Sequence, residues 1–150
     1  MSIQSIIIAL SFISACRGLD MTRLRPYDLT AELMFIFEDI DQNGIMTVFE
    51  FETVFDRYDS NVDGRLTRSE YTTYICKSDP VQYELSHYLF DEYDVDGDHF
   101  LDYHDYDNFY NKMDTSADGL VVKTEFVNYW VLLFQKYENS DIHPMSTRCR

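Results

Sequence analysis

The sequence predicts an all-α domain of about six helices joined by short acidic turns. Three observations support this class. Four acidic twelve-residue segments recur along the chain, aromatic residues flank each of them, and the spacing between segments leaves room for helices. Asp79-Pro80 interrupts the chain between the second and third segments, where one helix must end before the next begins. A chain of 150 residues that is 45% hydrophobic is long and apolar enough for one domain with a core.

The net charge of the chain limits the kinds of partner that it is expected to bind. Twelve basic residues against 27 acidic residues give a formal net charge of −15. Such a chain cannot present the positive surface that nucleic acids or anionic lipids require, so neither is expected as a partner. The expected partners are cations, because the acidic residues are grouped rather than spread.

The two ends of the chain lie outside the expected domain, which covers residues 19–138. Residues 1–18 combine an apolar stretch with small residues, which is typical of a secretory signal peptide cleaved after residue 15, 16 or 18. A buried N-terminal helix is the alternative. The stretch is shorter than the roughly 20 apolar residues of a membrane span, so no integral span is expected. Residues 139–150 form a polar C-terminal tail.

Two cysteines remain once Cys16 is assigned to the leader region. Cys76 and Cys149 form an even pair, and in an oxidising compartment a disulfide would tie the tail to the domain. Two free thiols are the alternative, because spacing alone does not establish that the Cα atoms approach closely enough.

Each acidic segment places oxygen-bearing groups in the order that a twelve-residue calcium loop requires. Side chains at positions 1, 3, 5 and 9, a carbonyl at position 7 and a carboxylate at position 12 would surround one ion. Segment 39–50 offers Asp39, Asp41, Asn43, the carbonyl of Ile45, Thr47 and Glu50. Segment 59–70 offers Asp59, Asn61, Asp63, the carbonyl of Arg65, Thr67 and Glu70. Segment 94–105 offers Asp94, Asp96, Asp98, the carbonyl of Phe100, Asp102 and Asp105. Segment 114–125 offers Asp114, Ser116, Asp118, the carbonyl of Leu120 and Glu125.

These segments, with their flanks, resemble the EF-hand superfamily over residues 27–137. Position 8 is apolar in every segment, and the residue after position 12 is aromatic in every segment. A solvated acidic surface would explain the charge but not these two regularities. The resemblance implies an all-α EF-hand fold that binds up to four Ca²⁺ ions.

The four segments differ in the calcium affinity that their sequences predict. Position 6 is glycine in three of them and His99 in the third, although a left-handed backbone is required there. The third segment also ends in Asp105, one methylene shorter than glutamate, so we expect it to bind Ca²⁺ most weakly or to accept Mg²⁺. Segment 114–125 has Val122 at position 9, which can act only through water.

The spacing of the segments predicts which of them pair. Segments one and two start 20 residues apart, as do segments three and four, and the second pair is shifted by 55 residues from the first. Each such pair must share one helix, near 48–58 or 103–113, and therefore lies at its opposite ends. Segments two and three have room for helices at 68–77 and 81–93 and form a side-by-side pair. We expect segment one to pair with segment four in a compact, nested domain.

Two functions are compatible with such loops. The first is a secreted calcium-binding protein that serves as a buffer, matrix component or calcium-stabilised adaptor, similar to acidic EF-hand proteins of calcified matrices. Its partners would be calcium ions, and an extracellular matrix protein or mineral. The alternative is an intracellular sensor that binds a target helix, with the N-terminal stretch as an anchor or core helix. Sensor grooves are usually rich in methionine, whereas phenylalanine and tyrosine dominate here.

An enzyme is not expected. The four histidines are scattered, and the chain offers no arrangement of Ser, His and Asp or of Cys and His with a plausible scaffold.

Overall fold

The computed structural model describes residue 19, residues 21–140 and residue 149. Within these residues the chain forms six α-helices, one short 3₁₀ helix and four two-residue strands. The elements are η1 (Met21–Leu24), α2 (Tyr27–Glu38), β1 (Ile45–Met46), α3 (Val48–Asp56), β2 (Leu66–Thr67), α4 (Arg68–Ser78), α5 (Tyr83–Tyr93), β3 (Phe100–Leu101), α6 (Tyr103–Met113), β4 (Val121–Val122) and α7 (Lys123–Glu138). The predicted all-α class with about six helices is therefore confirmed, with two small sheets added to it.

The predicted helices lie within a few residues of the observed ones. Helix α6 has the predicted bounds, and α4 extends one residue beyond its predicted end. Helix α5 begins at Tyr83 rather than at residue 81, because Asp79-Pro80 is followed by a turn in which the Gln82 N–H binds the Asp79 carbonyl. Helix α3 ends at Asp56, two residues before the predicted end.

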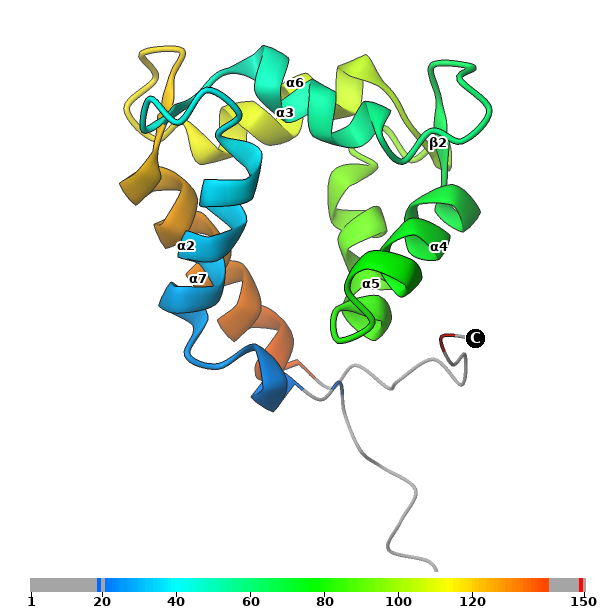
Figure 1. Ribbon diagram of the computed structural model, residues 1–150, viewed down its shortest axis with the longest axis horizontal. Coiled ribbons are helices and arrows are strands. Elements are labelled where there is room, and N and C mark those ends of the chain that lie inside the picture. The colour runs from blue at the N-terminus through cyan, green and yellow to red at the C-terminus, as the bar shows by residue number, and fades with distance from the viewer. Residues whose placement is uncertain (1–18, 20, 141–148, 150) are drawn as a thin grey trace, which may run out of the picture.

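The helices pack as three pairs, α2 with α7, α4 with α5, and α3 with α6 (Figure 1). Helices α3 and α6 lie across the top of the molecule, and the other two pairs descend from their opposite ends. The strands also pair in an order that crosses the chain. Strand β1 runs antiparallel to β4, and β2 runs antiparallel to β3. The first and last acidic segments thus meet at one end of α3 and α6, and the middle two meet at the other.

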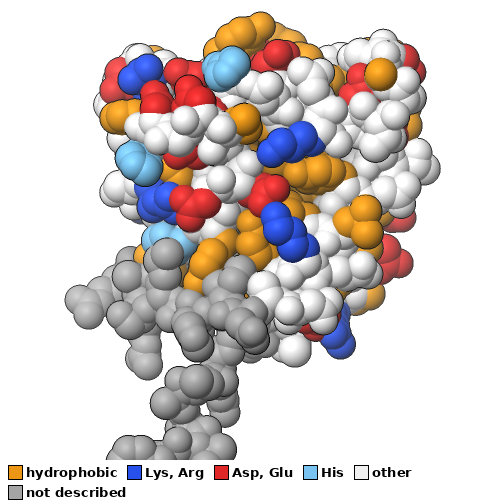
Figure 2. Space-filling view, turned by 180° about the vertical axis from the view of Figure 1, so that it is seen from behind, with side chains coloured by type: hydrophobic (Ala, Val, Ile, Leu, Met, Phe, Trp, Pro, Cys, Tyr) orange, Lys and Arg blue, Asp and Glu red, His pale blue; other side chains and the backbone are white. Residues whose placement is uncertain are grey.

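Aromatic rings hold α3 against α6. The rings of Phe51 and Phe109 stack with centroids 5.8 Å apart, and those of Phe55 and Tyr106 stack at 4.4 Å. The core continues through buried side chains of α5 and α7, among them Trp130, the single tryptophan of the chain. On the face seen from behind, acidic side chains gather at the upper corners and apolar side chains occupy the middle (Figure 2).

Candidate metal centres

The backbone of all four acidic segments turns through the left-handed region twice. At position 6 this conformation falls on Gly44, Gly64 and Gly119, as expected, and on His99 with φ of 71°. His99 therefore adopts the turn that glycine adopts elsewhere, at a strain of roughly 1–2 kcal/mol. A Cβ at Gly44 would contact no atom within 4 Å, so glycine is favoured there by its φ of +84° alone.

Position 4 is the second left-handed residue of each segment, and the ligand pattern does not predict its conformation. Gln42, Val62 and Ala117 have φ of 57–58°, and Gly97 occupies the same position in the third segment. The third segment therefore has its glycine at position 4 and a side chain at position 6, which reverses the order in the other three.

The first aspartate of each segment holds the turn by accepting backbone hydrogen bonds. One carboxylate oxygen accepts the N–H of the residue at position 6 in all four segments, and the other accepts an N–H of position 4 or 5. The four position-6 bonds are Gly44 to Asp39 at 2.9 Å, Gly64 to Asp59 at 2.9 Å, His99 to Asp94 at 3.1 Å and Gly119 to Asp114 at 2.8 Å. Each aspartate thus stands at the centre of its turn, with its oxygens converging on the loop interior.

The side chains at positions 3 and 5 are exposed and cap the N–H groups two residues further on. Asp41 and Asp96 accept from position 5 at 3.0 and 3.1 Å, and Asp63, Asp98 and Asp118 accept from position 7 at 2.9 Å. Asn43 and Asn61 make the corresponding bonds at 2.8 Å, and the Ser116 hydroxyl donates to Asp114 at 3.2 Å. These bonds fix the side chains above the turn rather than leaving them free in solvent.

The acid at position 12, called here the closing acid, accepts hydrogen bonds from residues at the start of its own segment. Glu50 Oε1 accepts the N–H groups of Ile40 and Asp41 at 2.9 and 3.2 Å, while Oε2 accepts the N–H of Thr47 at 2.9 Å. Burial raises the pKa of Glu50, but these hydrogen bonds outweigh it and the pKa lies below its ordinary value. In the second segment the Thr67 hydroxyl, Thr67 N–H and Ser60 hydroxyl bind Glu70, and they lower its pKa in the same way.

Glu125 closes the fourth segment through the same kind of contacts. Its Oε1 accepts the Ser116 N–H and the Thr115 hydroxyl, both at 2.9 Å, and its Oε2 accepts the Val122 N–H at 3.2 Å. Burial raises the pKa of Glu125 while the hydrogen bonds lower it, and the net pKa is below its ordinary value. Val122 itself is exposed and contributes no side-chain oxygen, as its type requires.

Asp105 differs from the other three closing acids. It is 1% exposed, and it accepts the N–H groups of Val95 at 2.7 Å and Asp102 at 3.1 Å. Burial raises its pKa, the two hydrogen bonds lower it, the charges of Asp96 and Asp102 raise it further, and the net pKa lies above its ordinary value. The shorter side chain thus sits deeper in the protein and in a more negative environment.

Threonine at position 9 has a role that the ligand pattern did not predict. Thr47 and Thr67 are the N-caps of α3 and α4, and each forms a reciprocal capping box with the glutamate three residues later. Asp102 and Asp105 make the same box at the start of α6. The signal was present in the sequence as a Thr-x-x-Glu pattern at the start of α3 and of α4.

Among the described residues there are two groups of three carboxylates whose oxygen atoms converge. Within each group, one oxygen atom from every residue lies within 4.8 Å of the others. The groups are Asp39, Asp41 and Glu50 in the first segment, and Asp94, Asp96 and Asp98 in the third. Both groups could hold a metal ion. The first includes its closing acid and the second does not, since Asp105 lies outside it. The acids of segments 59–70 and 114–125 do not form such a group, and the other side-chain oxygens expected there are those of Asn61, Thr67 and Ser116.

Contacts between segments join the sites in pairs. The buried Tyr110 hydroxyl donates to the Met46 carbonyl at 2.7 Å and accepts the Val121 N–H at 3.1 Å, so it links β1 to β4. At the other end, Arg65 lies 3.6 Å from carboxylate oxygens of both Asp98 and Asp102. A cation of the protein therefore already faces the acidic third segment from the second.

Cys76 and Cys149 form a disulfide, with Cα atoms 5.4 Å apart, and are not free thiols. The predicted signal peptide and most of the tail lie outside the described residues. Among the residues that are described, no helix has the length and hydropathy of a membrane span.

Comparison with protein-family models, curated proteins and solved structures finds no match.

Proposed function

We propose that this protein is a secreted calcium-binding protein whose four acidic segments act as EF-hand loops. The observation that carries the proposal is the repeated arrangement of oxygen atoms. In every segment the first and last acids fold over a doubly left-handed turn and offer oxygen ligands only, which suits a hard cation such as Ca²⁺. Pairing of the segments through β1–β4 and β2–β3 supports it further.

The charge of the chain gives metal binding a role in stability. About half of the 27 acidic residues stand at ligand positions, and their mutual repulsion disfavours the compact state. Four divalent ions would offset eight of the fifteen net negative charges. Each site filled at a hundred times its dissociation constant adds about 2.7 kcal/mol if only the folded state binds.

Secretion is supported by two features. Residues 1–18 have the composition of a signal peptide, and the Cys76–Cys149 disulfide suits an oxidising compartment. Extracellular sites of this type bind with dissociation constants of about 10⁻⁴–10⁻³ M, so the ions would be mostly bound and would serve structure. Intact-mass measurement of the secreted chain tests this part, with a mass beginning near residue 16, 17 or 19 expected. A full-length cytosolic product would contradict it.

Calorimetric titration with Ca²⁺ tests the metal sites directly. Three or four sites are expected, and fewer than two would contradict the assignment. Removing the metal with a chelator should lower both helicity and the midpoint of thermal unfolding. Variants of single ligands, such as Glu50→Gln, should each lose one site. Their matched control is Glu84→Gln in the first turn of α5, which removes a carboxylate outside every ligand position and should leave the number of sites unchanged.

A further inference from the structure

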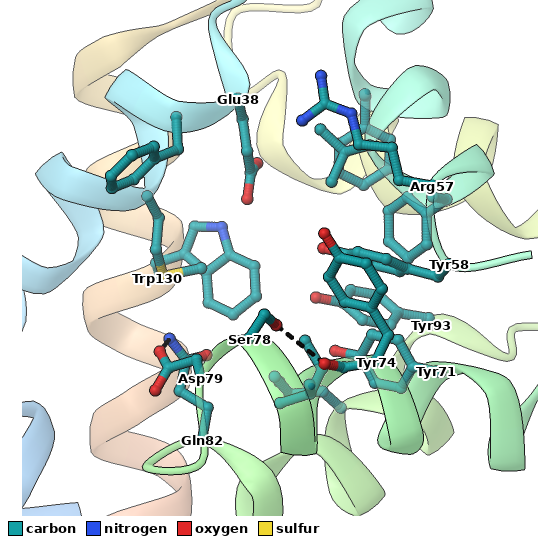
Figure 3. Close-up of a pocket in the computed structure, with 17 residues that line it drawn as sticks. Glu38, Arg57, Tyr58, Tyr71, Tyr74, Ser78, Asp79, Gln82, Tyr93 and Trp130 are labelled. Carbon is teal, nitrogen blue, oxygen red and sulfur yellow. Dashed lines mark hydrogen bonds between the residues drawn. The ribbon is translucent and has the colours of Figure 1, made fainter.

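A cavity of about 440 Å³ lies in the centre of the molecule, between the three helix pairs. Its volume falls in the range of about 300–1,000 Å³ that is usual for small-molecule sites. Its walls come from α2, α3, α4, α5 and α7, and aromatic rings form much of them (Figure 3). None of the predicted metal ligands lines this cavity, so it is separate from the four acidic segments.

Two carboxylates line this aromatic cavity. That of Asp79 accepts the Val81 N–H at 3.2 Å and the Gln82 side-chain N–H at 2.9 Å, whereas that of Glu38 has no such partner. Glu38, the last residue of α2, points into the cavity, and Figure 3 shows its oxygens above the indole of Trp130. Glu38 makes no hydrogen bond or ion pair with any other described residue, and the nearest opposite charge that acts on it is Arg57 at the rim. Glu38 is half-buried and its carboxylate opens into the cavity, so a positively charged group in the cavity would meet a negative charge that no hydrogen bond or ion pair of the described residues satisfies.

The remaining walls favour a positive charge as that group. Trp130 and the tyrosines of α4 and α5 line the cavity, and the tyrosine hydroxyl oxygens, which carry partial negative charge, point into it (Figure 3). The faces of aromatic rings carry negative potential and attract cations. The rings of Tyr58 and Tyr74, for example, lie with centroids 4.3 Å apart on the wall opposite Glu38.

Trp130 supplies a second, independent sign of a missing partner. The residue is 2% exposed, yet its Nε1 has no hydrogen-bond partner among the described residues. In Figure 3 this nitrogen lies on the side of the ring that faces Glu38. The cavity is therefore lined by a donor, the Trp130 N–H, and by an acceptor, the Glu38 carboxylate, and neither is paired with a described residue.

We propose that the central cavity binds a small organic cation, an amine or quaternary ammonium compound with an apolar body, with Glu38 as its counter-ion and the aromatic rings as its walls. The apolar body fills the cavity beside Trp130. An oxygen atom next to the cationic centre would accept the Trp130 N–H. Arg57 lies at the rim and competes with the ligand for Glu38.

Trp130 fluorescence reports on binding, because the chain contains no other tryptophan. The full-length protein in excess calcium is titrated with benzyltrimethylammonium, with neopentylbenzene as its neutral isostere and with phenylmethanesulfonate as an anion of similar size. All three titrations are run at the same mildly alkaline pH, so that only the charge of the added compound differs between them. We expect saturable binding of the cation, at least about ten-fold tighter than that of either comparison compound.

Two variants separate charge recognition from simple apolar binding. Glu38→Gln should weaken benzyltrimethylammonium at least about ten-fold and leave neopentylbenzene unchanged, whereas Arg57→Gln should tighten the cation several-fold. Asp28→Asn, which removes an exposed charge from the first turn of α2, is the matched control and should change neither. Equal binding of the cation and its neutral isostere, weaker cation binding in Arg57→Gln, or no saturable binding of the cation would overturn the proposal. The Arg57→Gln result decides the matter even if Glu38→Gln does not fold.

Discussion

Removal of a single hydroxyl group tests whether the first and last acidic segments stabilise each other. Tyr110 on α6 is 1% exposed, and its hydroxyl accepts the Val121 N–H at 3.1 Å. The same hydroxyl donates to the Met46 carbonyl at 2.7 Å, with the Gly119 carbonyl at 3.2 Å as a second acceptor. Tyr110→Phe keeps the buried ring and removes these bonds without leaving a large cavity.

The expected loss follows from the bonds that disappear. The hydroxyl has one proton, so it makes one donated and one accepted bond at a time. At about 0.5–1.5 kcal/mol net for each bond, Tyr110→Phe should lower the free energy of unfolding by about 1–3 kcal/mol. The effect lies at the upper end of this range if the Val121 N–H and the Met46 carbonyl find no other partner in the buried site.

Urea unfolding followed by far-UV circular dichroism measures this loss, in excess calcium and again with a chelator. The control is Tyr103→Phe on the same helix, since Tyr103 is 67% exposed and should change the free energy of unfolding by less than about 0.5 kcal/mol. Equal stability of Tyr110→Phe and the wild type, with unchanged denaturant slopes, would show that the hydroxyl does not join the two segments.

Three further perturbations have defined outcomes. Glu50→Gln and Glu70→Gln should each abolish one site in calorimetric calcium titrations while the fold persists in excess calcium, and an unchanged number of sites in both variants would contradict the ligand assignment. Burial raises the Glu38 pKa from 4.5 to about 8. Between pH 4.5 and about 8 the folded state therefore holds a proton that the unfolded state has lost. Over this range the free energy of unfolding should fall by up to about 1.4 kcal/mol for each unit by which the pH rises. Glu38→Gln should flatten that stretch of the pH profile measured by urea unfolding, and an unaltered slope would refute the assignment. Cys149→Ser opens a loop of 73 residues, which in the chain-entropy model costs about 4 kcal/mol, and thermal unfolding with the reduced wild type as control measures the loss.

Much of the arrangement of the fold was predictable because it depends on distances along the chain. Two acidic segments that share one helix cannot lie side by side, so each must find its partner elsewhere. The position of Asp79-Pro80 likewise required a break between two helices, and α4 and α5 flank it. These predictions need only the rise of a helix and the loss of one backbone donor at proline.

Other features depend on contacts that no spacing reveals. Gln42 and Val62 adopt left-handed φ although neither residue type favours it, because the turn around the first aspartate imposes that conformation. Tyr110 binds a carbonyl 64 residues away, which becomes predictable only when the strand order is known. Glu38 precedes the first acidic segment and matches no motif, and its place in the wall of the aromatic cavity becomes visible only in the folded chain. The capping boxes were available in the sequence, but the ligand pattern of the same residues concealed them.

The internal shift of 55 residues explains why the two sheets are alike. Adding 55 to Ile45 and Met46 gives Phe100 and Leu101, and subtracting it from Val121 and Val122 gives Leu66 and Thr67. The register of one sheet, Ile45 with Val122 and Met46 with Val121, therefore becomes that of the other, Phe100 with Thr67 and Leu101 with Leu66. The same shift exchanges the pair α2–α7 with the pair α4–α5 and brings α3 onto α6. Exchanging the two halves of the chain thus leaves the set of paired elements unchanged, as in a two-fold interface between two equal halves. The nested order of the segments thus follows from duplication of a three-helix unit, in which each half lacks the partner strands that the other supplies.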